Sequence, residues 1–113
     1  MSPNTRPVYL RLRDRIAAGI IDGTYAEGAA LPSVRALAAA EGANPLTVAK
    51  AYQQFQIDGL VQVHRGVGMF VAAGAAARLR GSERKAFIED EWPLLRERLK
   101  VLDIDIDELL ARA

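Results

Sequence analysis

The sequence predicts a mainly α-helical fold that also contains one small β-hairpin. Two observations lead to this prediction. Apolar residues recur at helical spacing in several stretches that begin at a capping residue or a proline and end at a glycine. Between residues 60 and 71, two runs that favour strands flank a glycine-rich turn. The chain has 113 residues, which is enough for one compact core and a smaller extension.

The composition excludes several classes of protein. The chain has no cysteine, so disulfides and thiolate metal sites are absent, and a cytoplasmic location is the simplest expectation. Because His64 is the one histidine, a Ser-His-Asp catalytic set or a histidine metal cluster lacks its parts, and we expect no metal and no cofactor. No apolar run approaches the roughly 18 to 20 residues that span a bilayer, so we expect no membrane partner.

The first helix is predicted from Pro7 to about residue 22. Proline suits the first turn of a helix, and Gly23 is a suitable C-terminal cap. One face carries a stripe of apolar residues at helical spacing, made up of Tyr9, Leu12, Ile16 and Ile20. We therefore expect this helix to serve as scaffold.

Two further helices should follow in close succession. Ser33 can accept a backbone N–H bond at the start of a second helix, which we expect to end near Gly42. Asn44 can cap a third helix in the same way, and Pro45 loses no hydrogen bond at its first position. Residues 29–31, just before these helices, are expected to add a short strand.

The third helix, predicted from Pro45 to Asp58, should have two distinct faces. Apolar residues at positions i, i+3, i+4 and i+7 predict a buried face made up of Val48, Ala51, Tyr52 and Phe55. The other face is mostly polar and carries Leu46, Thr47, Lys50, Gln53 and Gln54. Residues 60–64 and 69–71 then predict two strands around a basic tip. Together these elements predict a winged helix-turn-helix domain over residues 6–74.

This arrangement favours double-stranded DNA as the partner, because the second helix of such a pair enters the major groove. The hairpin tip would then reach the adjacent minor groove, where an arginine is attracted and a glycine permits close approach. The simpler interpretation of each candidate is a helix cap, a turn residue or a solvated surface charge. The candidate DNA-binding residues are Arg6, Ser33, Arg35, Asn44, Pro45, Thr47, Lys50, Arg65 and Gly66.

The same region resembles a known family. Between Leu31 and Val61 the sequence contains, in order, Leu-Pro-Ser-x-Arg-x-Leu-Ala, Asn-Pro-x-Thr-Val, Lys-Ala-Tyr and Gly-Leu-Val. With these motifs, residues 6–71 resemble the DNA-binding domain of GntR-type bacterial transcription regulators, and the short C-terminal part is similar to the YtrA-like branch. The resemblance implies a homodimer that binds a palindromic operator, usually as a repressor. Many relatives carry arginine at the position of Ala49, so their operator sequences do not transfer to this chain.

The remaining residues, 75–113, predict a helical dimerisation extension. Residues 72–77 have the composition of a small-residue linker, and Ser82 can cap the helix after it. Pro93 should kink that helix, and Asp105 should start a last short one. Apolar residues recur at the spacing of a heptad seam, which consists of Ile88, Trp92, Leu95, Leu99 and Leu102. The simpler alternative is a seam that folds back onto its own winged domain.

Two other functions stay open at this point. A winged-helix module that binds proteins would use the same surface, although the polar Thr47, Lys50 and Arg65, without a large apolar patch, argue against it. An enzyme is the second alternative, because one branch of the resembled family fuses this domain to an aminotransferase-like domain. About 40 residues after the winged domain are too few for a cofactor pocket of several hundred Å³, so we expect no enzyme.

Overall fold

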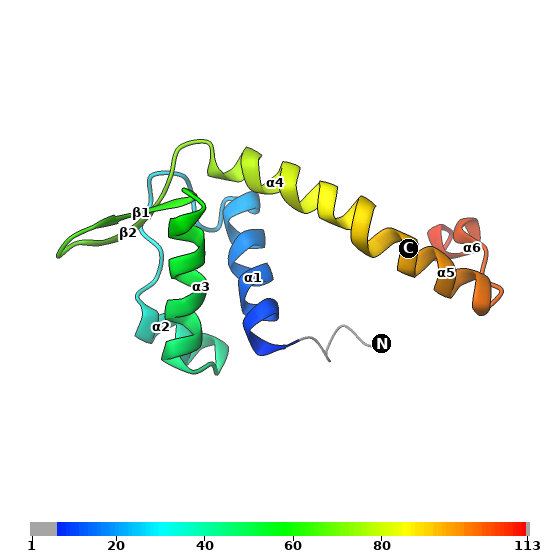
Figure 1. Ribbon diagram of the computed structural model, residues 1–113, viewed down its shortest axis with the longest axis horizontal. Helices are drawn as coiled ribbons and strands as arrows, with labels where there is room; N and C mark the ends of the chain where they lie inside the picture. The colour runs from blue at the N-terminus through cyan, green and yellow to red at the C-terminus, as the bar shows by residue number, and fades with distance from the viewer. Residues whose placement is uncertain (1–6, 113) are drawn as a thin grey trace. The chain divides into compact units, whose positions relative to one another are not determined.

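The computed structural model describes residues 7–112, and the chain divides into two compact units, Met1–Leu79 and Arg80–Ala113. Its elements are α1 (Val8–Asp22), α2 (Val34–Glu41), α3 (Pro45–Ile57), β1 (Val61–His64), β2 (Gly68–Val71), α4 (Ala75–Ala86), the π-helical segment η2 (Phe87–Glu91), α5 (Trp92–Val101) and α6 (Ile106–Leu110). This mainly helical fold with one antiparallel hairpin is the predicted one (Figure 1). Among the described residues, no helix is both long and apolar enough to cross a membrane.

The core of the first unit lies among α1, α2 and α3. The predicted stripe of α1 is buried at Leu12, Ile16 and Ile20, whereas Tyr9 at its start is only half-buried. All members of the predicted inner face of α3 are buried, and α1 runs beside α3 (Figure 1). Helical spacing therefore identified the buried faces of both helices. The opposite face of α3 remains exposed.

Both predicted caps form at the starts of α2 and α3. The Ser33 hydroxyl oxygen accepts a hydrogen bond from the Ala36 N–H at 3.1 Å. The Asn44 side-chain oxygen accepts one from the Leu46 N–H at 2.8 Å, and Pro45 is the first residue of α3. These bonds satisfy backbone groups that a helix start otherwise leaves unpaired. The first turns of α2 and α3 are thereby fixed in place.

The hairpin projects from the helices as a wing (Figure 1). Val61 pairs with Val71 at its base, and His64 pairs with Gly68 near its tip. The strand predicted over residues 29–31 is reduced to a single bridge between Ala30 and Phe70. This bridge anchors the wing to the loop that precedes α2.

One prediction for the linker is wrong. The helix expected to begin at Ser82 begins seven residues earlier, at Ala75, so Ser82 lies inside α4 and does not cap it. Alanine has the highest helix propensity, so a run of small residues can extend a helix as readily as it can link two domains. Here Ala75 and Leu79 are fully buried in the first unit, and their packing selects the helix.

The second unit contains a helical irregularity next to Pro93. The N–H of Trp92 bonds to the carbonyl of Phe87, five residues back, which closes a π-helical turn just before the proline. Prolines and π-turns are both recognised positions at which a helix departs from its regular hydrogen-bond pattern. As predicted, Asp105 starts the last helix, where its side chain accepts from the Asp107 N–H at 3.1 Å.

Candidate nucleic-acid interface

The exposed face of α3 is the centre of the candidate interface. Leu46 is 79% exposed, Lys50 is exposed, and Thr47 between them is half-buried. On the opposite side of the same helix, Val48 and Ala51 have no exposed surface. The helix is therefore fixed to the core along one side, and its first turns present side chains to solvent on the other. Ala49 is also exposed.

Lys50 is held by an aromatic ring from another helix. Its ammonium nitrogen lies 4.7 Å from the centroid of the Tyr9 ring on α1. A cation over an aromatic face is attracted by the electrons of the ring. The sequence places Tyr9 in the core stripe and does not predict this contact, because no local pattern connects two residues 41 positions apart.

A buried tyrosine connects α3 to the start of α2. The Tyr52 hydroxyl donates a hydrogen bond to the Pro32 carbonyl at 2.8 Å. Burial raises the pKa of Tyr52 above its ordinary value, so the hydroxyl keeps the proton that it donates. Ser33 and Arg35 follow directly and are both exposed. The bond thus sets the position of the α2 start relative to the exposed face of α3.

The tip of the wing carries the predicted basic residue. Arg65 and Gly66 are exposed, and Gly66 has a positive φ of 74°, which a glycine adopts without strain. His64 packs its ring against Phe70, with 4.7 Å between the ring centroids, so it is a structural residue of the hairpin. A groove of about 480 Å³ separates the wing from the start of α2, and its lining includes Ser33, Gly66 and Val67.

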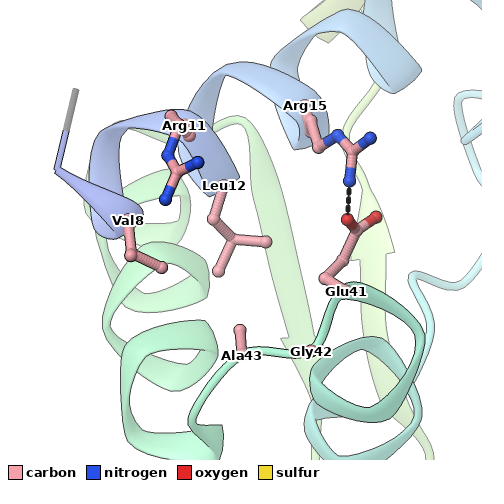
Figure 2. Close-up of a pocket in the computed structure, with 7 residues that line it drawn as sticks. All are labelled: Val8, Arg11, Leu12, Arg15, Glu41, Gly42 and Ala43. Atoms are coloured by element: carbon pink, nitrogen blue, oxygen red, sulfur yellow. Dashed lines mark hydrogen bonds and ion pairs between the residues drawn. The ribbon is translucent and has the colours of Figure 1, made fainter. Parts of the chain in front are cut away.

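Two arginines of α1, Arg11 and Arg15, border one cavity. Arg15 forms an ion pair with Glu41 at the end of α2, beside a cavity of about 370 Å³ that Arg11 also lines (Figure 2). Leu12 points from α1 toward Ala43 in the turn before α3 (Figure 2). The ion pair between Arg15 and Glu41 thus connects α1 to the end of α2. Arg6, the first predicted DNA-binding residue, lies outside the described residues.

A second contact that the sequence does not predict lies at the other end of α3. Arg78 on α4 donates hydrogen bonds to the carbonyls of Asp58, at 2.8 Å, and Gly59, at 3.3 Å. A guanidinium here satisfies carbonyls that a helix end leaves unpaired and complements the negative end of the helix dipole. The linker was predicted over residues 72–77, and no role was predicted for Arg78, which follows it.

Comparison with known proteins identifies the family of this domain. The family described as "Bacterial regulatory proteins, gntR family" matches residues 8–71. The chain belongs to the GntR family. It is also 31% identical over 102 residues to the HTH-type transcriptional repressor YtrA of Bacillus subtilis (strain 168), a match that covers 90% of this chain and 72% of that protein.

Solved structures agree with the family assignment. A GntR family transcriptional regulator from Listeria monocytogenes superposes with a TM-score of 0.74 at 25% identity, covering 97% of this chain and 95% of that one. The structure of AraR(DBD) in complex with operator ORX1 superposes with a TM-score of 0.57 at 26% identity, covering 64% and 87% of the two chains. This GntR-family protein is therefore a winged-helix, DNA-binding transcription regulator and not an enzyme.

Proposed function

We propose that this GntR-family regulator represses transcription by binding a palindromic operator as a homodimer in the cytoplasm. The observation that carries the proposal is the two-sided character of α3: Val48 and Ala51 are fully buried, while Leu46 and Lys50 on the other side are exposed. Side chains at the start of a helix that is held rigidly in this way can reach base edges in the major groove.

The residues around the start of α3 have distinct proposed roles. Thr47 and Lys50 contact bases or phosphates, and Arg35 binds a guanine edge or a phosphate with two parallel hydrogen bonds. The capping bonds of Ser33 and Asn44 use their oxygens as acceptors. The hydroxyl proton of Ser33 and the amide group of Asn44 can therefore donate to phosphate while the caps persist.

The wing supplies the minor-groove part of the proposal. Arg65 has a guanidinium that is attracted to the negative potential of a narrow A·T groove, and Gly66 beside it has no side chain to keep the backbone away. Arg6 precedes α1, and its proposed contact with a phosphate comes from the sequence alone.

The proposed dimer rests on the apolar seam of the second unit. Ile88, Leu95 and Leu102 are about half exposed, and Trp92 and Leu99 are partly exposed. With α6, the seam borders a cavity of about 290 Å³ whose lining includes Ile104, Ile106 and Leu109. A second copy of the same seam would cover this surface. Two-fold symmetry then requires inverted half-sites, and the repressor role is supported by the likeness to the repressor YtrA.

A binding selection with the full chain and random duplexes tests the proposal. The enriched sequence should contain two inverted half-sites whose centres lie about 10 base pairs, or one helical turn, apart. Footprints on half-site variants should show both sites protected together. Protection of one asymmetric site by a monomer would contradict the dimer, and a selection that enriches nothing would favour the protein-binding module.

The salt dependence of binding provides a second test. If Arg35, Lys50 and Arg65 neutralise phosphates, the affinity should fall with a log–log slope of about −0.9 per phosphate contacted. An affinity that does not change with salt would contradict the proposed contacts with phosphate. A reporter with the selected operator behind its promoter tests repression, since added protein should lower its expression.

A further inference from the structure

Leu46 is an apolar side chain that is largely exposed on α3. It is the second residue of α3, and 79% of its surface is exposed. The bond from its own N–H to the Asn44 cap, 2.8 Å long, fixes its backbone position. Other exposed side chains on α3, such as Lys50, Gln53 and Gln54, are polar. A leucine in this position gains little from burial within its own chain, so its contribution to the fold is small.

We infer that Leu46 is a specificity-determining residue that contacts the C5 methyl group of a thymine in the operator. The inference rests on the proposed function, in which the first turn of α3 enters the major groove. A leucine side chain can neither donate nor accept a hydrogen bond. Among the four bases, thymine alone presents an apolar group at the major-groove edge, and guanine, adenine and cytosine present donors and acceptors.

The polar edges of the other bases would be penalised at the same place. A donor or acceptor covered by Leu46 loses its hydrogen bonds to water and gains none from the protein. Contact with a methyl group instead removes apolar surface from water on both partners. Leu46 therefore favours a T·A pair, with the thymine methyl toward the helix, over the alternatives.

A second exposed apolar residue on the same helix supplies a matched control. Ile57 is the last residue of α3 and is 70% exposed, and it lies three turns from the end that enters the groove. Leu46→Ala and Ile57→Ala remove comparable apolar groups from the surface of one helix. Both variants should keep the thermal unfolding of the parent chain, since neither side chain belongs to the core.

The experiment replaces thymines of the selected operator one at a time with deoxyuridine. This change deletes the C5 methyl and leaves every hydrogen-bonding group in place. At one pair of symmetry-related positions, the parent chain should lose affinity about fourfold per half-site, the amount expected for one buried methyl. Leu46→Ala should bind the thymine and deoxyuridine operators equally at those positions, and Ile57→Ala should behave like the parent chain.

The outcomes separate the inference from the proposed function. If the parent chain tolerates deoxyuridine at every thymine, or if Leu46→Ala keeps the same sensitivity as the parent chain, the inference is wrong. In both cases specific binding to the unmodified operator would leave the proposed function standing. If no operator is enriched at all, the proposed function fails and the inference fails with it.

Discussion

The two units of this chain differ in where they place their apolar side chains. In the first unit, residues such as Ile16, Val48 and Phe55 are at most 2% exposed and form one continuous core. In the second unit, no residue from Arg80 to Arg112 is buried. Both units are built from helices with apolar stripes, so the difference does not come from secondary structure.

The difference shows which unit can bury its apolar stripes within one chain. The stripes of α1 and α3 face one another, and the first unit removes them from water within one chain. The stripe of α5 has only the short α6 beside it in the second unit, and Leu95 and Leu102 remain about half exposed. We therefore expect substitutions in the first unit to act on folding or DNA contacts, and substitutions in the seam to act on assembly.

The largest expected effect comes from charge in the seam. In the proposed dimer, the double variant Trp92→Glu, Leu99→Glu would place two carboxylates opposite their copies in the partner subunit, and the dimer should dissociate. Affinity for the operator should then fall by about 100-fold or more, because the two half-sites are no longer bound by linked domains. Sedimentation equilibrium measures the dissociation, and gel shifts on the complete operator measure the affinity.

Leu94→Glu is the matched control for this variant. Leu94 is exposed on α5 but does not belong to the seam. This variant should keep the oligomeric state and the operator affinity of the parent chain. The seam would not act on assembly alone if the seam variant stays dimeric, or if its first unit unfolds at a lower temperature than that of the parent chain.

The next effect concerns DNA recognition in the first unit. Arg35→Ala should weaken operator binding by about 1 to 3 kcal/mol and relax the preference at one base pair, if the guanidinium makes a bidentate contact with guanine. Because Arg35 is exposed, dimerisation and unfolding should not change. Binding curves on operators with each base substituted measure the effect. An equal loss on every sequence would show that Arg35 anchors a phosphate instead.

The sequence predicted the fold wherever a local signal agreed with packing. Asn44, Pro45 and the helical spacing after them defined the start and inner face of α3 correctly. The start of α4 was wrong because an alanine-rich segment has no local signal that distinguishes a linker from a helix. Burial of Ala75 and Leu79 decides between them, and that packing involves residues far away in the chain.

The exposure of the candidate site residues could be predicted from the sequence, but the contacts that support them could not. Arg35, Lys50 and Arg65 are all exposed, as their predicted positions require. The bond from Tyr52 to Pro32 and the contact between Lys50 and Tyr9 join residues 20 and 41 positions apart. Such pairings follow from the way helices pack, and a single sequence does not contain them.

A smaller effect is expected when Tyr52 loses its hydroxyl. Tyr52→Phe leaves the Pro32 carbonyl without this donor and should lower the free energy of unfolding by about 0.5 to 1.5 kcal/mol. Urea unfolding at neutral pH measures the difference. The seam lies in the other unit, so the oligomeric state should be the same as that of the parent chain.

The same variant tests the raised pKa of Tyr52. In the unfolded chain a tyrosine loses its proton near pH 10, whereas burial keeps Tyr52 protonated in the folded chain to higher pH. The folded state then binds more protons than the unfolded state, so stability is lost as pH rises above about 10. Tyr52→Phe should lose less stability than the parent chain over that range. Identical pH profiles for the two chains would contradict the shift.

The smallest effect is expected at Tyr9, whose ring lies beside Lys50, a proposed DNA contact of the same unit. A cation over an aromatic ring at an exposed site is worth about 0.5 to 1 kcal/mol. Tyr9→Leu should therefore weaken operator binding about two- to fivefold by releasing Lys50, whereas Tyr9→Phe keeps a ring and should bind normally. In the Lys50→Met background the difference between these two variants should vanish. NMR of the protein without DNA provides an independent readout, because the ring should shift the signals of the Lys50 side chain in the parent chain and in Tyr9→Phe only. A shift that is present without any coupling to affinity would mean that Tyr9 packs against Lys50 but does not position it for DNA.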